Sequence, residues 1–478
     1  SHPAPIAQVV QTAQNTTDRL TPKADVEFSS TPPPATGFTI TVDSNTRYQT
    51  MEGFGGALTD SAAITLARLK VANESAYEQV MDMYFGEDGL QYRFIRWPMG
   101  ACDFTYDPSW SYDETKDDYT LDEFSMKHDE EYRFPIMKDA IARRTKSNAT
   151  LEVLGSPWSA PGWLKQGGHM VCGVVGSLEG CSLINTTIAH STYAYYFQRW
   201  IEGMEAEGIP VWGVTVVNEP QINFLTYPGM AFSPEQERDF VRDFLGPILA
   251  AKHPDVNILY LDHNKDKLPK WAPVVLGDDK AASFFWGAAV HWYTGDHFDD
   301  LAATHAQFPT HGLFATEATA VPDFKTEKTG GDWGLAEHYL HDQLGDFNNF
   351  VAGWLDWNLI LGKDGGPMSV NFLTVNISGS DSMFLTDLDA GAVYPQTIYY
   401  YMGHTSKFVA PGSVRLAWSI TPDAGNSTLQ TASFVRPDNS IVTVVLNEAG
   451  AATNYTVALG GEYATVPCPP HSIQTLVY

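Results

Sequence analysis

The stretch VWGVTVVNEP, residues 211–220, decides the fold that we predict for this chain. Its valines form a continuous apolar run, which is typical of a strand buried on both faces of a parallel sheet. Proline interrupts strand pairing, so Glu219 should lie at the carboxyl end of this strand, directly after Asn218. Catalytic residues of parallel barrels sit at such ends. The structural alternative is a glutamate that caps the next helix or faces water.

A second strand-like stretch, LFATE at residues 313–317, also ends in a glutamate. At roughly 30 residues per βα unit, Glu317 follows Glu219 by about three units. Two carboxylates at strand ends three units apart can face each other across the mouth of a barrel. Retaining glycosidases need this arrangement, with one acid and one nucleophile about 5 Å apart.

Eight strand-like segments alternate with helical or long-loop segments, which predicts an α/β fold built on a (β/α)8 TIM barrel. The expected strands cover residues 52–57, 92–97, 151–154, 211–220, 257–261, 287–293, 313–317 and 351–358. Helices are expected after Thr59-Asp60, over residues 188–206, and from the capping box that begins at Ser233.

The pattern changes near residue 408, where short Val/Thr/Leu-rich runs alternate with turns and predict an antiparallel β-sandwich. These runs cover residues 414–420, 428–435, 440–447, 453–458 and 472–478. Residues 1–30 are expected to form a loose arm, and the strand 38–42 is expected to pair with 48–51 and to join the sandwich. The predicted domains are an arm with a strand of the β-domain at 1–48, a catalytic barrel at 49–407 and the sandwich at 408–478, so both chain ends build the second domain.

Composition limits the partners. The 478 residues carry a formal net charge of −28, which disfavours nucleic acid and anionic membrane surfaces because both require basic patches. No run of 18 uninterrupted apolar residues occurs, so we expect no stable membrane insertion. The expected partner is a carbohydrate or glycolipid substrate, and the charge favours neutral sugars. Composition leaves the oligomeric state open.

Cysteines and glycosylation sequons indicate the compartment. Cys172 and Cys181 flank a Gly-rich loop and are expected to form a disulfide, whereas Cys102 and Cys468 are expected to be reduced and buried. No Cys/His spacing resembles a zinc site. Asn-x-Ser/Thr sequons begin at Asn15, Asn73, Asn148, Asn185, Asn376, Asn426 and Asn454. This density fits a secreted glycoprotein, with a lysosomal or vacuolar location as the alternative.

The expected strand ends also gather polar and aromatic side chains. These are Arg96, Asp103, Trp158, Asn218, His291, Tyr293, Trp357 and Asn358. Each one has an ordinary explanation, such as an ion pair for Arg96, core packing for the tryptophans or a loop cap for Asp103. Their convergence at one end of one barrel favours a functional site.

Several ordered segments of the chain resemble glycoside hydrolase family 30, and within it the glucosylceramidase branch. They are Gly53–Ala57, Ala101–Phe104, Ser156–Trp158, Asn218–Pro220, His291–Tyr293, Phe314–Glu317, Gly353–Asn358 and Gly403–Phe408. The resemblance extends from about residue 50 to the end. It implies a retaining mechanism without a cofactor or metal, in which Glu317 is the nucleophile and Glu219 the acid/base.

The resemblance also implies roles for the surrounding residues. Asn218 would hydrogen-bond the sugar 2-hydroxyl, and Arg96 and Tyr293 would hold the nucleophile ionised and oriented. Residues implied around the terminal glucose are Asp103, Trp158, Trp357 and Asn371, with His291 and Asn358 in support. For the acid role, burial or the other carboxylate should raise the pKa of Glu219.

The rim of the site departs from the family pattern, at residues 172–181, 221–230 and 320–335. These loops leave the aglycone open. The leading hypothesis is a retaining β-glucosidase of the glucosylceramidase type. The alternatives are an endo-β-1,6-glucanase or β-xylosidase of the same family and, more remotely, a non-catalytic carbohydrate-binding barrel.

Overall fold

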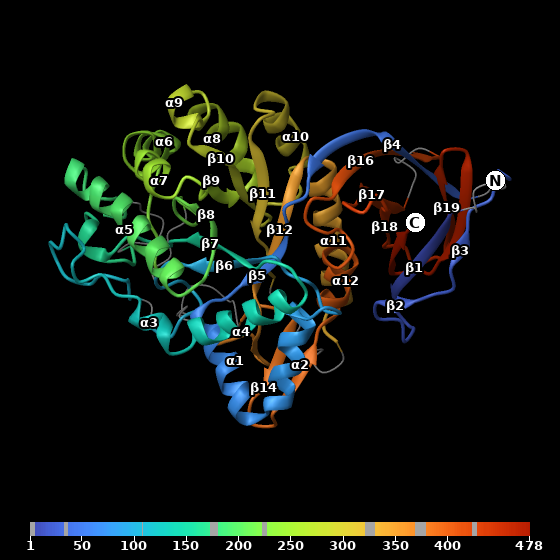
Figure 1. The fold of residues 1–478 in the computed structure, drawn as a ribbon, viewed down its shortest axis with the longest axis horizontal. Coiled ribbons are helices and arrows are strands. Elements are labelled where there is room, and N and C mark those ends of the chain that lie inside the picture. Colours follow the sequence, from blue (N-terminus) through green and yellow to red (C-terminus); the bar gives the residue numbers. More distant parts are fainter. Residues whose placement is uncertain are drawn as a thin grey trace.

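The structure is a computed structural model that describes residues 5–32, 37–107, 109–172, 180–221, 227–320, 330–368, 379–422 and 428–478. A closed parallel barrel and a ten-stranded sheet lie beside each other, as Figure 1 shows. Both chain ends lie in the ten-stranded sheet, on the side away from most of the barrel helices.

The barrel strands follow one another around the cylinder in chain order. They are β5 (Gly53–Ala57), β6 (Phe94–Pro98), β7 (Glu152–Ser156), β8 (Val211–Thr215), β9 (Asn257–Asn264), β10 (Phe285–His291), β11 (Gly312–Glu317) and β12 (Val351–Asn358). The pairing of β12 with β5 closes the ring, so the predicted (β/α)8 barrel is confirmed. The strand β8 is shorter than expected, because it ends at Thr215 and leaves Glu219 in the following turn at a φ of 47°.

Helices and helical turns cover the outside of the barrel. They are α1 (Asp60–Ala72), α2 (Glu74–Phe85), α3 (Lys127–Glu130), α4 (Arg133–Lys146), η1 (Gly162–Leu164), α5 (Thr187–Ala206), α6 (Pro234–Phe240), η2 (Val241–Leu245), α7 (Gly246–Lys252), η3 (Lys265–Lys267), α8 (Leu268–Val275), α9 (Asp279–Ala282), α10 (Phe298–Gln307), α11 (Trp333–Asn348) and α12 (Thr397–Ser406). The predicted caps are present, because Thr59 accepts from the Ala62 N–H and Ser233 with Gln236 forms a capping box.

An apolar layer fills part of the barrel interior. Its members are Phe94, Leu154, Trp212, Leu259, Ala289, Phe314 and Leu355, together with the partly buried Trp286. The rings of Phe94 and Phe314 meet edge to face with centroids 5.3 Å apart, a favourable aromatic geometry. The interior is therefore a packed core, and the side chains toward the carboxyl ends of the strands stand on it.

The second domain is one continuous sheet of ten strands. They are β1 (Ile6–Ala13), β2 (Thr21–Pro22), β3 (Val26–Glu27), β4 (Phe38–Thr50), β16 (Val414–Thr421), β17 (Leu429–Val435), β18 (Ile441–Asn447), β19 (Thr453–Leu459), β20 (Glu462–Cys468) and β21 (Ser472–Val477). All five strand runs predicted after residue 408 are present, while β20 was not predicted. The sheet is mostly antiparallel, but β19 pairs with β4 in parallel.

Two predictions for the N-terminal region were wrong. Residues 6–13 are not a loose arm, because β1 pairs with β21 over residues 8–13 and with β3 at residues 6 and 7, and it buries Ala7 and Val9. The segments 38–42 and 48–51 do not pair with each other, because residues 38–50 form the single strand β4 along β16. The sequence analysis missed β1 for two reasons. The composition around it is polar, and its partner strand β21 lies at the opposite end of the chain.

Smaller features complete the fold. A three-stranded sheet comprises β13 (Leu361–Gly362), β14 (Phe384–Asp387) and β15 (Ala392–Pro395). Cys172 and Cys181 form the predicted disulfide, and Cys102 and Cys468 are buried as expected. Within the described ranges, none of the helices has the length and apolarity needed to cross a membrane.

Candidate active site

Glu317 ends β11 and is held by two side chains, Arg96 from β6 across the barrel and Tyr293 from just after the neighbouring strand β10. Arg96 of β6 donates from Nη1 to Glu317 Oε2, and the Tyr293 hydroxyl donates to Oε1 at 2.6 Å. Arg96 is fully buried, and Glu317 is only 8% exposed. A buried carboxylate costs free energy unless it is paired and hydrogen-bonded, and both conditions are met here. Glu317 is thus fixed with both oxygens in use.

Asp262 of β9 joins the two sides of the site, and the sequence analysis did not single it out. Its Oδ2 accepts from Arg96 Nη2 at 2.9 Å and from the Thr215 hydroxyl at 2.6 Å. Its Oδ1 accepts from the Thr316 hydroxyl at 2.7 Å and lies 2.9 Å from His291 Nε2. Burial works against its charge, but Arg96 and His291 outweigh burial and keep the pKa of Asp262 well below its ordinary value.

An irregularity in β9 turns Asp262 into the barrel. Leu261 and Asp262 have φ values of 76° and 46°, and the pairing with β10 shifts register at this point. The left-handed region costs a non-glycine residue about 1–2 kcal/mol. The buried Glu237 carboxylate of α6 accepts from the Leu261 N–H at 3.1 Å and so supports this bend. The polar run DHN at residues 262–264 was the available signal, but the expected strand stopped at residue 261.

Glu219 lies against His291 in the turn after β8. His291 Nδ1 is 3.2 Å from Glu219 Oε1, and the Glu219 N–H donates to the Asp262 carbonyl at 2.9 Å. Burial opposes the charged imidazole, yet Glu317, Asp262 and Glu219 together raise the pKa of His291 to about 9. Burial also favours a protonated Glu219, but the hydrogen bond and charge of His291 outweigh it and lower the pKa of Glu219.

The prediction of a raised pKa for Glu219 is therefore wrong for the site without substrate. The reasoning considered burial and the second carboxylate but not an imidazolium in hydrogen-bond contact. The proton expected on Glu219 resides on His291, one hydrogen bond away. The pair Glu219–His291 still holds one proton in total.

Aromatic rings form one wall of the site. The rings of Trp158 and Trp357 are stacked with centroids 5.3 Å apart, and the Arg96 guanidinium lies 5.0 and 5.3 Å from the two centroids. Tyr227, which the sequence analysis missed, packs against the same cluster. Burial, followed by the charge of Glu219, raises the pKa of its phenol well above the ordinary value.

Two further candidates differ in how they relate to the carboxylates. Burial and the charge of Glu317 raise the pKa of Asp103 well above its ordinary value, so Asp103 lies within electrostatic reach of the site and favours a neutral carboxyl group. Asn218 is buried, and its Oδ1 accepts from Arg96 Nη2 at 2.8 Å. The Asn358 side chain instead accepts from Thr59 at the start of α1. Asn371 lies outside the described residues.

The two glutamates approach each other closely. Side-chain ligand atoms of Glu219, His291 and Glu317 all lie within 4.8 Å of one another. Retaining glycosidases place their carboxyl groups about 5–5.5 Å apart, whereas inverting enzymes need about 6.5–9.5 Å. The geometry therefore fits direct attack by a carboxylate. Glu219, His291 and Glu317 could ligate a cation only by giving up their contacts to Arg96, Tyr293 and Asp262. The positive charges of Arg96 and His291 would also repel a cation at this place.

Family comparisons agree with this geometry. Residues 51–409 match the description "Glycosyl hydrolase family 30 TIM-barrel domain", and residues 412–476 match "Glycosyl hydrolase family 30 beta sandwich domain". The chain belongs to glycoside hydrolase family 30. The family 30 assignment covers both parts of the fold and makes the chain a glycoside hydrolase. The predicted resemblance is therefore confirmed.

Individual relatives of this family 30 enzyme bear two kinds of names. Lysosomal acid glucosylceramidase of Mus musculus is 35% identical over 456 residues, which cover 93% of this chain and 84% of the relative. Endo-1,6-beta-D-glucanase neg1 of Aspergillus fumigatus is 26% identical and covers 95% of this chain and 90% of its own length. Among solved structures, SrfJ from Salmonella typhimurium superimposes with a TM-score of 0.88 at 25% identity, and 99% of each chain is covered.

Proposed function

We propose that this chain is a retaining β-glucosidase of the glucosylceramidase type, with Glu317 as the nucleophile and Glu219 as the acid/base. The observation that carries the proposal is the approach of the two carboxylates to within 4.8 Å at the mouth of the barrel. The pairing of Glu317 with Arg96 and Tyr293 supports the nucleophilic role, because it orients an ionised carboxylate.

In the first step, a Glu317 oxygen attacks the anomeric carbon while the bond to the leaving oxygen breaks. Glu219 donates its proton to that oxygen, so the aglycone leaves as a neutral alcohol. The product on the enzyme is an α-linked ester of Glu317. Arg96 and Tyr293 then lose their anionic partner, but Arg96 remains paired with the Asp262 carboxylate.

His291 supplies the proton that this step requires. Its Nδ1 faces Glu219 Oε1, and substrate binding that displaces water favours the arrangement with a neutral imidazole and a protonated Glu219. The pair is electrically neutral in both arrangements, so the shift moves no net charge into the buried site. Asp262 fixes the ring through Nε2 in either state.

In the second step, water attacks the anomeric carbon and Glu317 leaves as a carboxylate. Glu219 accepts the water proton and passes it back to the pair. Two inversions give net retention, so a β-glucoside yields β-glucose. The reaction is a hydrolysis in which every proton gained at one step is returned at the other.

The sugar and the compartment belong to the same proposal. The stacked pair Trp158–Trp357 would offer an apolar surface beside the carboxylates for the terminal glucose, and Asn218, whose Oδ1 accepts from Arg96, would donate from its amide nitrogen to the 2-hydroxyl. Secretion is supported by the disulfide, which suits an oxidising compartment. The described sequon asparagines are all exposed, namely Asn15, Asn73, Asn148, Asn185 and Asn454. A glycolipid aglycone rests on the glucosylceramidase names of the relatives.

The test is product analysis by proton NMR on a β-glucoside with an aryl aglycone and on glucosylceramide. The expected first product is β-glucose from both substrates, with α-glucose appearing only through mutarotation. Initial α-glucose would mean inversion and would contradict the role of Glu317. Release of glucose from the aryl glucoside but not from glucosylceramide would remove the glucosylceramidase assignment and keep the β-glucosidase.

The second candidate is an endo-1,6-β-glucanase, because relatives with that name match 95% and 89% of this chain. The two candidates share all steps at the carboxylates and differ in the aglycone. A β-1,6-linked glucan separates them, since an endo-enzyme releases oligosaccharides at once whereas a glucosidase releases only glucose.

A further inference from the structure

Lys165 is a buried cation to which the proposed mechanism gives no role. It follows β7 and lines a pocket of about 650 Å³ between the loops after β6 and β7, yet only 1% of the residue is exposed. Burial alone lowers the pKa of its ammonium group to about 7, and no carboxylate of the described residues contributes to this shift. A buried charge without a counter-charge costs free energy, so its hydrogen bonds must compensate for that cost.

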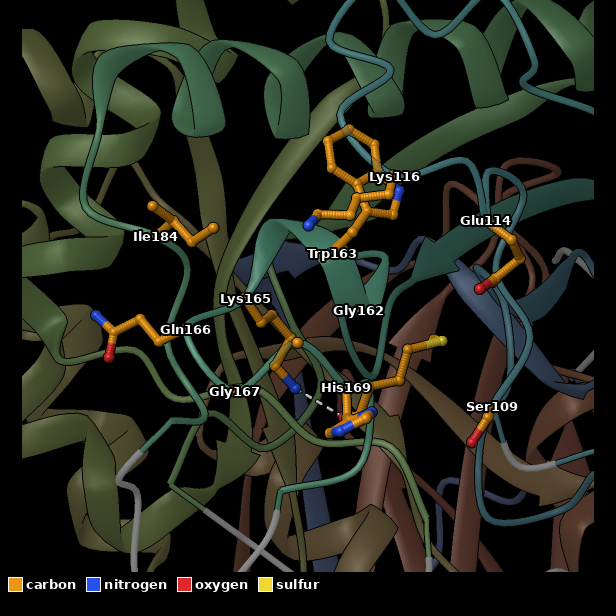
Figure 2. Close-up of a pocket in the computed structure, with 12 residues that line it drawn as sticks. Ser109, Glu114, Lys116, Gly162, Trp163, Lys165, Gln166, Gly167, His169 and Ile184 are labelled. Carbon is orange, nitrogen blue, oxygen red and sulfur yellow. Dashed lines mark hydrogen bonds between the residues drawn. The ribbon is translucent and has the colours of Figure 1, made fainter.

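The ammonium group of Lys165 links two loops that follow different barrel strands. It donates to the Met170 carbonyl at 2.7 Å and to the Gly229 carbonyl at 2.5 Å. Figure 2 draws the first of these hydrogen bonds as a dashed line. Met170 belongs to the loop after β7, whereas Gly229 belongs to the loop after β8. Hydrogen bonds from a charged donor are stronger than those between neutral groups, so this link holds the two loops together.

Backbone contacts join the same two loops beside the ammonium group. The Gly229 N–H donates to the Met170 carbonyl at 3.2 Å, and Val171 forms an antiparallel bridge with Pro228. Pro228 and Gly229 are both buried, and Tyr227 directly precedes them. Two residues along the chain span at most about 7 Å, so a shift of the Gly229 carbonyl moves Tyr227 as well.

Tyr227 lies where the loop after β8 meets the active site. Its side chain packs against the cluster that contains Trp158 and Trp357. Burial raises the pKa of its phenol, and the negative charges of Glu219 and Glu317 raise it further. The phenol therefore lies within electrostatic reach of both carboxylates. The link made by Lys165 thus ends at a side chain that borders the site.

From these contacts we propose that Lys165 is a positioning residue, which holds Tyr227 beside the two carboxylates by linking the loops after β7 and β8. The ammonium group donates to backbone carbonyls rather than to Glu219 or Glu317, so it acts through the loop. The inference rests on the proposed function, because Tyr227 would border the sugar that lies between the two glutamates. Without the ammonium group, the buried Gly229 carbonyl loses its charged donor, and the cost of that loss favours movement of the loop.

The test is a double-mutant cycle on kcat and KM for 4-nitrophenyl β-D-glucoside. Lys165→Met keeps an unbranched apolar side chain and removes the donors. We expect KM to rise about tenfold while kcat stays within about threefold. In a Tyr227→Ala background the same substitution should change KM by less than about twofold, because the side chain that Lys165 positions is absent. Lys116→Met, at an exposed lysine of the same pocket, is the matched control and should change neither value.

The cycle can overturn the inference in two ways. An equal rise in KM with and without the Tyr227 side chain would show that Lys165 acts only on the fold. An unchanged KM in either single variant, Lys165→Met or Tyr227→Ala, would contradict the inference as well. If Lys165→Met does not fold, Lys165→Gln, which keeps an amide donor, replaces it in the cycle, and the same pattern with a smaller rise in KM is expected.

Hydrogen exchange separates failure of the inference from failure of the proposed function. Exchange of the backbone amides of residues 227–232, followed by mass spectrometry, should be at least about tenfold faster in Lys165→Met than in the unaltered protein, while the amides of α11 keep their exchange rate. Faster exchange supports the inference even if the unaltered protein does not cleave the aryl glucoside, in which case the proposed function alone fails. Unchanged exchange overturns the inference whatever the activity.

Discussion

Two layers of the same barrel interior have opposite chemistry. In one layer Phe94, Leu154 and Phe314 pack together as an apolar cluster. Two residues further along the same strands lie Arg96, Ser156 and Thr316, all buried and all hydrogen-bonded to one another or to Asp262. Side chains two residues apart on a strand point to the same face, so each strand contributes to both layers.

The difference between these layers separates stability from catalysis. The apolar layer gains free energy from burial, at about 25 cal/mol per Å². The polar layer buries an arginine, an aspartate, a histidine and Glu317, and such ion pairs seldom add net stability. We therefore expect substitutions in the two layers to have distinguishable effects.

The largest effect is expected at Glu317. Glu317→Gln should bind the sugar and lower kcat by about 10⁴-fold or more, because an amide cannot form the glycosyl ester. The free energy of unfolding, measured in urea, should change by less than about 1 kcal/mol, because the amide oxygen can still accept from Arg96 and the amide N–H can donate to the Tyr293 hydroxyl oxygen.

External azide tells the nucleophile from the acid/base. With Glu317→Ala, azide should attack the sugar directly and give the α-glycosyl azide. With Glu219→Ala, it should attack the covalent intermediate and give the β-azide. Exchange of these two products would mean that the two roles have been assigned the wrong way round, and full activity of Glu317→Gln would remove the nucleophile assignment altogether.

The next effect in size is expected in the apolar layer. Phe314→Ala should lower the free energy of unfolding by about 3–5 kcal/mol, because it leaves a cavity against Phe94 and Trp212. The folded fraction should keep kcat within about threefold. Val71→Ala, at a side chain that is 90% exposed, is the control and should be nearly neutral. A fall in the kcat of the folded fraction by more than about threefold would contradict the separation of the layers.

The sequence was sufficient for the eight barrel strands and for the prediction that Glu219 and Glu317 lie close together. Continuous apolar runs that end in a polar residue, such as residues 313–317, indicate buried parallel strands and place their ends together. The same logic placed Arg96 and His291 near Glu317. These predictions depend only on periodicity and on the rule that strand ends in a barrel meet at one face.

What periodicity missed depends on local backbone and on charge. Asp262 points inward because Leu261 and Asp262 adopt positive φ values, which a regular period of two does not anticipate. The strand β1 was missed because its partner is β21 at the other chain end. The pKa of Glu219 depends on the 3.2 Å contact with His291, a distance that no sequence pattern supplies.

A smaller effect, of about 10²-fold in kcat, is expected for Asp262→Asn. The amide removes the negative charge shared by Arg96 and His291 while keeping the side-chain shape. The basic limb of the pH profile should move to lower pH, which a merely structural loss would not cause. Asp356→Asn is a matched buried control on β12, because burial raises the pKa of Asp356 to about 8 and an amide resembles its neutral acid. An unchanged pH profile for Asp262→Asn would show that Asp262 has no influence on the proton.

The smallest effect on rate, and the most specific, is expected for His291→Asn. In the unaltered enzyme the pair Glu219–His291 keeps one proton up to the pKa of His291, about 9, so kcat/KM should fall only as the pH rises through that value. Without the imidazolium, burial dominates at Glu219 and raises its pKa, and Glu219 alone then determines the basic limb. We expect this limb to move down by more than about one pH unit, while kcat at acidic pH falls by about tenfold or less.

Stability gives an independent check on the same proton. Because the folded state raises the pKa of His291 from 6.5 to about 9, its protonation stabilises the fold fully below pH 6.5, and this contribution is lost as the pH rises toward 9. The free energy of unfolding of the unaltered protein, measured in urea, should therefore decrease across this pH range. The His291→Asn variant should not show this decrease. If the variant keeps both the pH-dependent loss of stability and the original basic limb, the proton must reside elsewhere, and Glu219 and its neighbour in the polar layer do not share it.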